Sequence, residues 1–172
     1  MSLFRRLFAK PDPYRASAAR LVASVMTGAR QPNLYLKGCA KDDFDGRFQM
    51  AALHGGLVMR RLKHLGNDAL IVSEKFGEAL FDRFDYAYRE EGVGDASIAR
   101  KVRKLGERYF GLARALDAAL DGAEPVQDVL VRNGLGGRSP GDLADYSQRA
   151  DAQLFTLSQD ALFVGDITWP SA

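Results

Sequence analysis

One stretch decides the fold: residues 42–62, which read DDFDGRFQMAALHGGLVMRRL. Its apolar and small side chains recur every three or four residues, the spacing of a buried helical stripe: Phe48, Ala51, Gly55, Val58, Leu62 and, just beyond, Leu65. Either Asp43 or Asp45 is expected to cap this helix, because a carboxylate favours the positive end of a helix. Gly55 and Gly56 each cost about 1 kcal/mol against alanine in a helix, so they predict a close approach by a second helix.

Helical patterns also fill the sequence on both sides of this stretch. One begins at Asp12 and Pro13, which suit an N-cap and a first helical position. After Gly66, which reads as a helix stop, Asn67 or Asp68 is expected to cap the next helix. The remaining helices are expected from Asp95 to residue 120, briefly within 121–134, and over 142–163, with loops over 27–46 and 135–142.

This pattern predicts an all-α protein with a single compact domain of about six mostly antiparallel helices, because short connections favour antiparallel neighbours. Alternation of apolar and polar residues with a period of two, which would indicate strands, is absent. We expect residues 1–11 to form a basic amphipathic segment, 12–165 the helical domain, and 166–172 a tail whose Trp169 docks on the body.

Charge is unevenly distributed, although the formal net charge is only +2. Up to Lys41 the only acidic residue is Asp12. The first residues combine an apolar with a basic helical face, which suits contact with a membrane surface, a partner groove or the domain's own core: Leu3, Phe4, Arg5, Arg6, Leu7 and Phe8. No apolar run approaches the ~20 residues that span a bilayer.

The helix that follows Asp95 carries a second basic group on its non-core side: Arg100, Lys101, Arg103, Lys104 and Arg108. Such a surface suits rRNA, anionic lipid head groups or an acidic protein, and the plainer interpretation is an ordinary solvated helix face.

Calcium and zinc sites are poorly supported around residues 42–62. Aligned on Gly46, an EF-hand loop would have Lys41 as its first ligand and Ala52 as its last, and neither can replace a carboxylate. His54 and His64 stand ten residues apart, not at the helical spacing of a metal-binding pair. His54 is therefore expected to be a packed histidine bonded to a carbonyl or carboxylate. We expect no metal site and no cofactor.

Magnesium-dependent chemistry on a diphosphate substrate is the enzymatic alternative. Asp82 with Asp85, and Asp117 with Asp121, share helix faces as such a site requires. The single Cys39 has no histidine near it in the sequence, so we expect no catalytic role for it. Arg47 opposes the helix dipole in the first turn, which predicts a specific carboxylate partner on a neighbouring helix or another protein.

Two segments together point to a family: DGRFQMAALHGGLVMRRL and FDRFDYAYREEGVGDASIARKVRKLGERYFGLARALDAAL. The chain resembles the ubiquinol–cytochrome c chaperone family, and in particular its alphaproteobacterial members. The resemblance lies in the order and spacing of five short motifs: Gly-Arg-Phe, Leu-His, Arg-Leu, Arg-Glu and Gly-Val-Gly-Asp. The resemblance runs from about Ser17 to Asn133. It departs at residues 41–43, where Lys-Asp-Asp stands in place of the family's common Pro-Asp-Thr.

The resemblance implies a non-catalytic assembly factor for the cytochrome bc1 complex that binds newly made cytochrome b or another bc1 subunit. Mitochondrial members act near the ribosomal exit tunnel with a small partner protein. It implies a cytoplasmic protein, peripheral at the inner membrane, or a mitochondrial one in a eukaryote. A general membrane-surface or ribosome-binding adaptor is the other alternative. Carried over by position, the expected partner-binding residues are Asp45, Gly46, Arg47, His54, Arg61, Arg89, Glu90, Gly92, Gly94 and Asp95.

Overall fold

A computed structural model describes residues 12–92 and 94–172, together with every side chain in those ranges except those of Asp95 and Ala96. The described residues form helices and no strand, which confirms the all-α prediction. The helices are α2 (Pro13–Ala29), α3 (Pro32–Leu36), α4 (Phe44–Lys63), α5 (Asn67–Glu90), α6 (Asp95–Leu120), α7 (Val126–Arg132), α8 (Pro140–Thr156) and α9 (Gln159–Phe163). The predicted membrane-contact segment, Leu3 to Phe8, lies outside the described residues.

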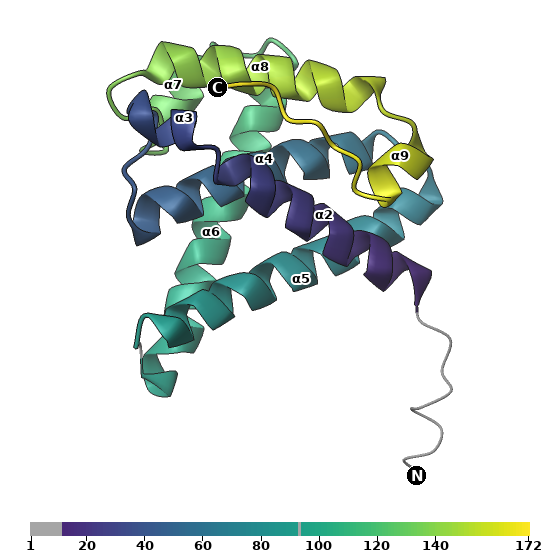
Figure 1. Ribbon diagram of the computed structural model, residues 1–172, viewed down its shortest axis with the longest axis horizontal. Helices are drawn as coiled ribbons and strands as arrows, with labels where there is room; N and C mark the ends of the chain where they lie inside the picture. Colours follow the sequence, from purple (N-terminus) through teal and green to yellow (C-terminus); the bar gives the residue numbers. More distant parts are fainter. Residues whose placement is uncertain (1–11, 93) are drawn as a thin grey trace.

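Helix α4 occupies the centre of the molecule. It contacts α2, α5, α6 and α8, and in Figure 1 it lies between α8 and α5 while α2 crosses in front of it. Every residue from Met50 to Val58 is buried. The predicted stripe was therefore too narrow, because a helix enclosed by four others has no polar face along this part of its length.

The two glycines of α4 mark the close approach that the sequence predicted. A Cβ at Gly55 would lie 3.0 Å from a Leu80 methyl carbon on α5 and 3.2 Å from the Tyr109 ring on α6. At Gly56 it would lie 3.5 Å from the Ala113 Cα on α6. A side chain at position 55 would need its neighbours to move, so α5 and α6 can pack at this distance only against glycine.

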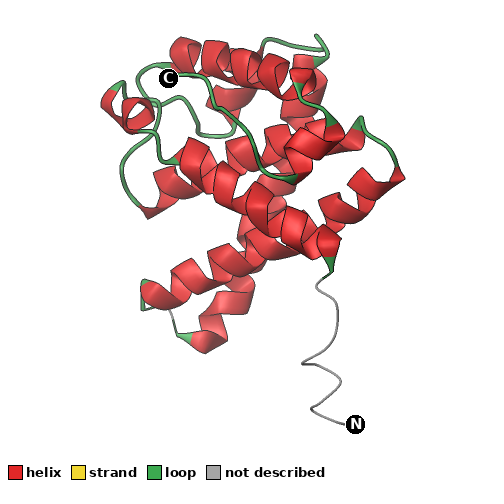
Figure 2. Cartoon of the chain, turned by 45° about the vertical axis from the view of Figure 1, so that its right-hand side comes forward, coloured by secondary structure: helices red, strands yellow, loops and turns green. Residues whose placement is uncertain are grey.

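Helices α5 and α6 meet at a corner that extends away from the other helices, as Figures 1 and 2 both show. Gly92 follows α5 with a φ of 74°, a backbone conformation that favours glycine. Two predicted caps were wrong. Gly94 precedes α6 in the N-cap position, so Asp95 is its first helical residue, and Gly66 likewise precedes α5.

The C-terminal quarter departs most from the sequence-based prediction. The single helix expected over 142–163 is two helices, because the chain becomes extended at Leu157 and Ser158 then caps α9 through a bond from the Ala161 amide. A short helix, α3, lies within the predicted loop after α2. The docking predicted for Trp169 is confirmed: its indole N–H donates to the Ser24 carbonyl of α2 at 2.9 Å.

Candidate functional site: a groove between α2, α4 and α5

The start of α4 forms one side of the site. Asp43 caps the helix, accepting a hydrogen bond from the Gly46 amide at 2.8 Å. Gly46 is required for a steric reason, since a Cβ there would collide with the Lys41 carbonyl. Of the two predicted caps, Asp43 is therefore correct, and Asp45 in the first turn is free to pair with another helix.

Both charged residues beside Gly46 have ion-pair partners. Arg47 Nε lies 2.7 Å from Asp42 Oδ1, so the predicted carboxylate partner exists, but it comes from the loop before the helix. Asp45 pairs with Arg108 of α6 at 2.7 Å. All four side chains are exposed. These ion pairs fix the positions of the side chains and leave them accessible to solvent.

The last turns of α5 form the opposite side. Tyr86 donates its hydroxyl to Glu90 at 2.8 Å, and Arg89 donates to Asp85 at 2.8 Å. Aromatic contacts join this segment to α4, with ring centroids 4.8 Å apart for Phe44 and Tyr88 and 4.9 Å apart for Phe48 and Phe84.

Between these segments and α2 lies an open groove of about 500 Å³. Its apolar side chains come from three helices: Met26, Ala29, Phe44, Phe48, Ala51, Phe84 and Ala87. Its charged side chains are Arg30, Asp42, Asp43, Arg47, Arg83, Glu90 and Glu91. Two segments some 40 residues apart in the sequence, both within the family resemblance, thus contribute to one concave surface. An apolar floor with polar groups around it is typical of a binding site.

Of the ten predicted partner-binding residues, Arg47 and Glu90 line this groove. His54 and Arg61 lie in other parts of the molecule. His54 is fully buried, with Nδ1 2.7 Å from the Met50 carbonyl and Nε2 2.6 Å from the Tyr146 hydroxyl. The carbonyl can only accept, so Nδ1 carries the proton and Nε2 accepts from Tyr146. Trp169 covers the ring edge-on at 4.6 Å. The prediction of a packed histidine bonded to a carbonyl is confirmed, and burial lowers the pKa of His54 to about 4.

Arg61 is the second of these residues. It lies near the far end of α4, where its guanidinium donates to the Leu157 carbonyl at 2.8 Å and stands over the Phe155 ring at 5.1 Å. It therefore holds the break between α8 and α9 and does not line the groove. The remaining predicted residues, Arg89, Glu90, Gly92, Gly94 and Asp95, lie at the end of α5 and the start of α6.

The predicted basic surface lies on α6, and all five residues are exposed: Arg100, Lys101, Arg103, Lys104 and Arg108. Three of them have contacts within the molecule. Arg108 pairs with Asp45, Lys101 lies over the Tyr88 ring at 5.3 Å, and Arg103 lies 3.8 Å from Glu107. Arg100 and Lys104 have the fewest contacts of the five within the described part of the chain.

One aspartate pair of the magnesium alternative, Asp117 and Asp121, serves a structural purpose. Arg60 of α4 lies 2.6 Å from Asp117, 2.7 Å from Asp121 and 3.2 Å from Asp151. A guanidinium therefore occupies the position that a cation would take. Among the described residues, no group of three or more His, Cys, Asp or Glu side chains could hold a metal ion.

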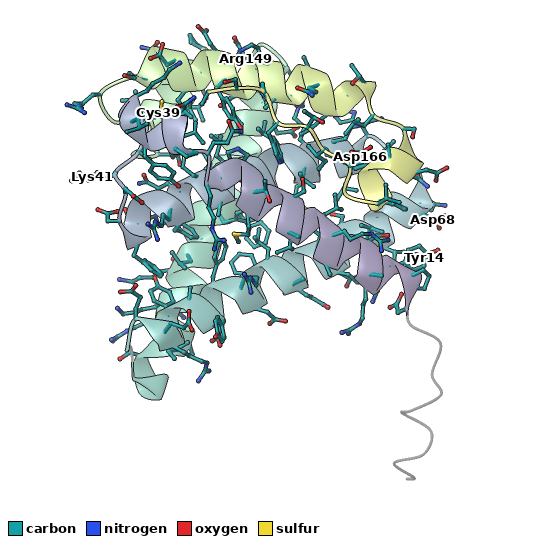
Figure 3. The ribbon with its side chains drawn as sticks, viewed as in Figure 1. Tyr14, Cys39, Lys41, Asp68, Arg149 and Asp166 are labelled. Carbon is teal, nitrogen blue, oxygen red and sulfur yellow. The ribbon has the colours of Figure 1, made fainter. Side chains whose placement is uncertain are left out.

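Cys39 lies with Lys41 in the connection between α3 and α4 (Figure 3). Its thiol is buried, and burial raises its pKa. A thiol in this environment is not activated as a nucleophile.

Sequence reasoning missed the α2 part of the groove. Met26 and Arg30 come from the end of α2, and Arg83 faces them from α5. Met26 belongs to the helical pattern that begins at Asp12 and Pro13, but that pattern does not specify which helix packs against α2.

No helix within the described ranges is both long and apolar enough to cross a membrane.

The fold described above has a counterpart among solved structures. The crystal structure of the Cbp3 homolog from Brucella abortus superposes with a TM-score of 0.80 and is 27% identical in sequence, covering 98% of this chain and 94% of that one. A search of curated proteins finds no match. The family model described as "Ubiquinol-cytochrome C chaperone" matches residues 40–169, so the likeness extends past Asn133, where the sequence motifs ended, to the docked Trp169. The chain belongs to the ubiquinol–cytochrome c chaperone family.

Proposed function

We propose that this protein is a non-catalytic assembly chaperone that binds newly made cytochrome b at the groove between α2, α4 and α5, and so supports assembly of the bc1 complex. Membership of a chaperone family supports the general role. The observation that supports this site is the groove itself, which has a volume of about 500 Å³ and a floor of aromatic and aliphatic side chains. It lies between two segments that belong to the family resemblance. An unassembled membrane subunit exposes apolar helices, and such a surface can cover them.

Two other functions have weaker support. An aspartate-bound magnesium enzyme would need Asp117 and Asp121 free, whereas Arg60 holds both. A general adaptor would use the exposed basic residues of α6, of which Arg100 and Lys104 are the most available. That surface and the basic N-terminal segment are proposed to hold the chaperone near anionic lipid. Equal flotation with anionic liposomes after deletion of residues 1–10 would contradict the N-terminal contribution.

The groove is tested by filling it. Ala87 lines the groove, so Ala87→Trp places an indole in the space that a client side chain would occupy. Tagged protein is captured from gently solubilised native cells, and co-purifying membrane subunits are quantified by mass spectrometry. We expect enrichment of cytochrome b with the native chain and its loss with Ala87→Trp.

The matched control is Ala118→Trp, at an exposed position on α6 outside the groove. Equal melting temperatures for the two variants establish that both fold. Undiminished capture of cytochrome b by folded Ala87→Trp would contradict the groove as the client site. Failure of the native chain to capture any bc1 subunit would contradict the function itself.

A further inference from the structure

We propose that the seam between α2 and α5 receives an apolar helix of the client that carries a carboxylate facing Arg30 and Arg83. The inference rests on the proposed function, since it extends the same groove and specifies the chemistry of its occupant.

The groove continues along the seam. A second open groove of about 490 Å³ lies between α2 and α5, and it shares Met26, Arg30 and Arg83 with the first. Its other walls are mainly small or aliphatic, including Ala19, Val22, Ala23 and Ala79. The two together form one trough.

The length and walls of this trough fit a helix. From Ala79 to Glu91 a helix rises about 18 Å at ~1.5 Å per residue, which is roughly three turns of an occupant lying alongside. Small side chains on both walls allow a second helix to approach closely, whereas the larger Met26 and Phe84 provide apolar contact towards α4. Binding of an amphipathic helix in an apolar groove is a recurrent mode of recognition.

The charges of the trough select the occupant. Arg30 and Arg83 are both exposed, and within the described part of the chain neither guanidinium group has a hydrogen-bond or ion-pair partner. Of the four acidic groups at the other end, Asp42 pairs with Arg47, Asp43 caps α4 and Glu90 accepts from Tyr86, so Glu91 is the one without such a partner among the described residues. The centre of the trough therefore presents two uncompensated guanidinium groups, which favour a carboxylate on the occupant.

The same charges argue against two other occupants. Residues 1–11 of this chain carry Arg5, Arg6 and Lys10 and no acidic residue, so they would bring like charges to the two arginines. A second copy of the chain, joined across a two-fold axis at this seam, would face Arg30 and Arg83 with the same pair.

The test uses three fluorescein-labelled 14-residue Leu/Ala helical peptides that differ only in a central Glu, Gln or Lys, titrated with the full chain and read by fluorescence anisotropy. We expect the Glu peptide to bind about tenfold more tightly than the Gln peptide, and the Lys peptide to bind most weakly. The preference for Glu should shrink at high salt. Arg30→Gln with Arg83→Gln should abolish it, Arg30→Glu with Arg83→Glu should reverse it towards Lys, and Arg114→Gln on α6 should leave it intact.

Equal binding of the Glu and Gln peptides by the native chain would overturn the inference. Tighter peptide binding after deletion of residues 1–10 would also overturn it, because the trough would then be occupied by the chain's own terminus. A dimer that Ala87→Trp dissociates would overturn it as well, because the occupant would then be a second copy of the chain. These outcomes are separable from failure of the proposed function. If Ala87→Trp abolishes capture of cytochrome b while the peptides show no charge preference, the groove is the client site and only the carboxylate is wrong.

Discussion

Each end of α4 has an arginine paired with aspartate, but the pair near the start is exposed and the arginine near the end is buried. Near its start, Arg47 meets Asp42 with side chains 64% and 60% exposed. Near its end, Arg60 is 8% exposed and meets three aspartates, two of which belong to α6 or the residue after it and one to α8. An exposed ion pair in water contributes little, whereas a buried charge whose partners are removed is costly. One end of α4 therefore fixes the fold, and the other remains a surface that a partner can use.

The largest effect is expected at the buried end. Arg60→Leu leaves Asp151 without its cation and Asp117 with Lys63 alone, in a poorly hydrated site. We expect a loss of about 3–5 kcal/mol in the free energy of unfolding, measured by urea denaturation. Arg132→Leu, which removes an exposed partner of Glu124, is the matched control and should change stability little.

The Arg60 effect should also depend on pH. Burial opposes ionisation of Asp117, but hydrogen bonds from Lys63 and Arg60 outweigh it and lower its pKa. The hydrogen bond from Arg60 also lowers the pKa of Asp121. The stability that these pairs supply is present above the ordinary aspartate pKa of about 3.9 and is lost as the pH falls through the lowered values. The difference between native chain and variant should therefore narrow in acid, and a constant difference from pH 7 to pH 3 would contradict this account of the cluster.

The contribution of His54, in the middle of α4, to the free energy of unfolding should change at a higher pH than that of the Arg60 cluster. His54 has a pKa of about 4 in the folded chain and about 6.5 when unfolded, so below pH 6.5 protons bind the unfolded state more tightly. The native chain should lose about 2 kcal/mol between pH 7 and pH 5 through this group. His54→Gln cannot titrate, and its free energy of unfolding should change less over the same interval. Parallel curves for the two proteins would show that His54 is not the group responsible.

The next prediction concerns the corner between α5 and α6, which extends away from the other helices. Gly92 has a φ of 74°, and a Cβ there would contact nothing within 4 Å, so any penalty must come from the backbone. We expect Gly92→Val to cost about 1–2 kcal/mol, read from the urea midpoint. Gly77 lies inside α5 with equally open surroundings, and Gly77→Ala should instead stabilise by up to about 1 kcal/mol. A Gly92→Val protein with an unchanged midpoint would show that this corner is not held by its backbone conformation.

Several local features were predictable from the sequence, whereas the identity of the helices that pack together was not. The Asp12 and Asp43 caps follow from short-range chemistry, and the glycines of α4 correctly indicated close packing. The groove depends on which helix lies beside α2, and no local pattern specifies that. For the same reason Asp117 and Asp121 resembled a metal motif, because the arginine that neutralises them is more than 50 residues away.

The smallest effect on stability, and the most informative for function, is expected at the exposed end. Arg47 lines the groove, and its bond to Asp42 lies within one loop and one helical turn, so Arg47→Ala should leave the denaturation midpoint unchanged within error. The same change alters the charge of the groove rim and should reduce capture of cytochrome b by the tagged chain. Arg15→Ala removes a comparably exposed arginine from α2 outside the groove and should reduce neither. If Arg47→Ala unfolded the protein as Arg60→Leu should, the contrast between the two ends of α4 would be wrong. If it folded and captured cytochrome b normally, the contrast would stand, but the rim at Arg47 would have no part in holding the client.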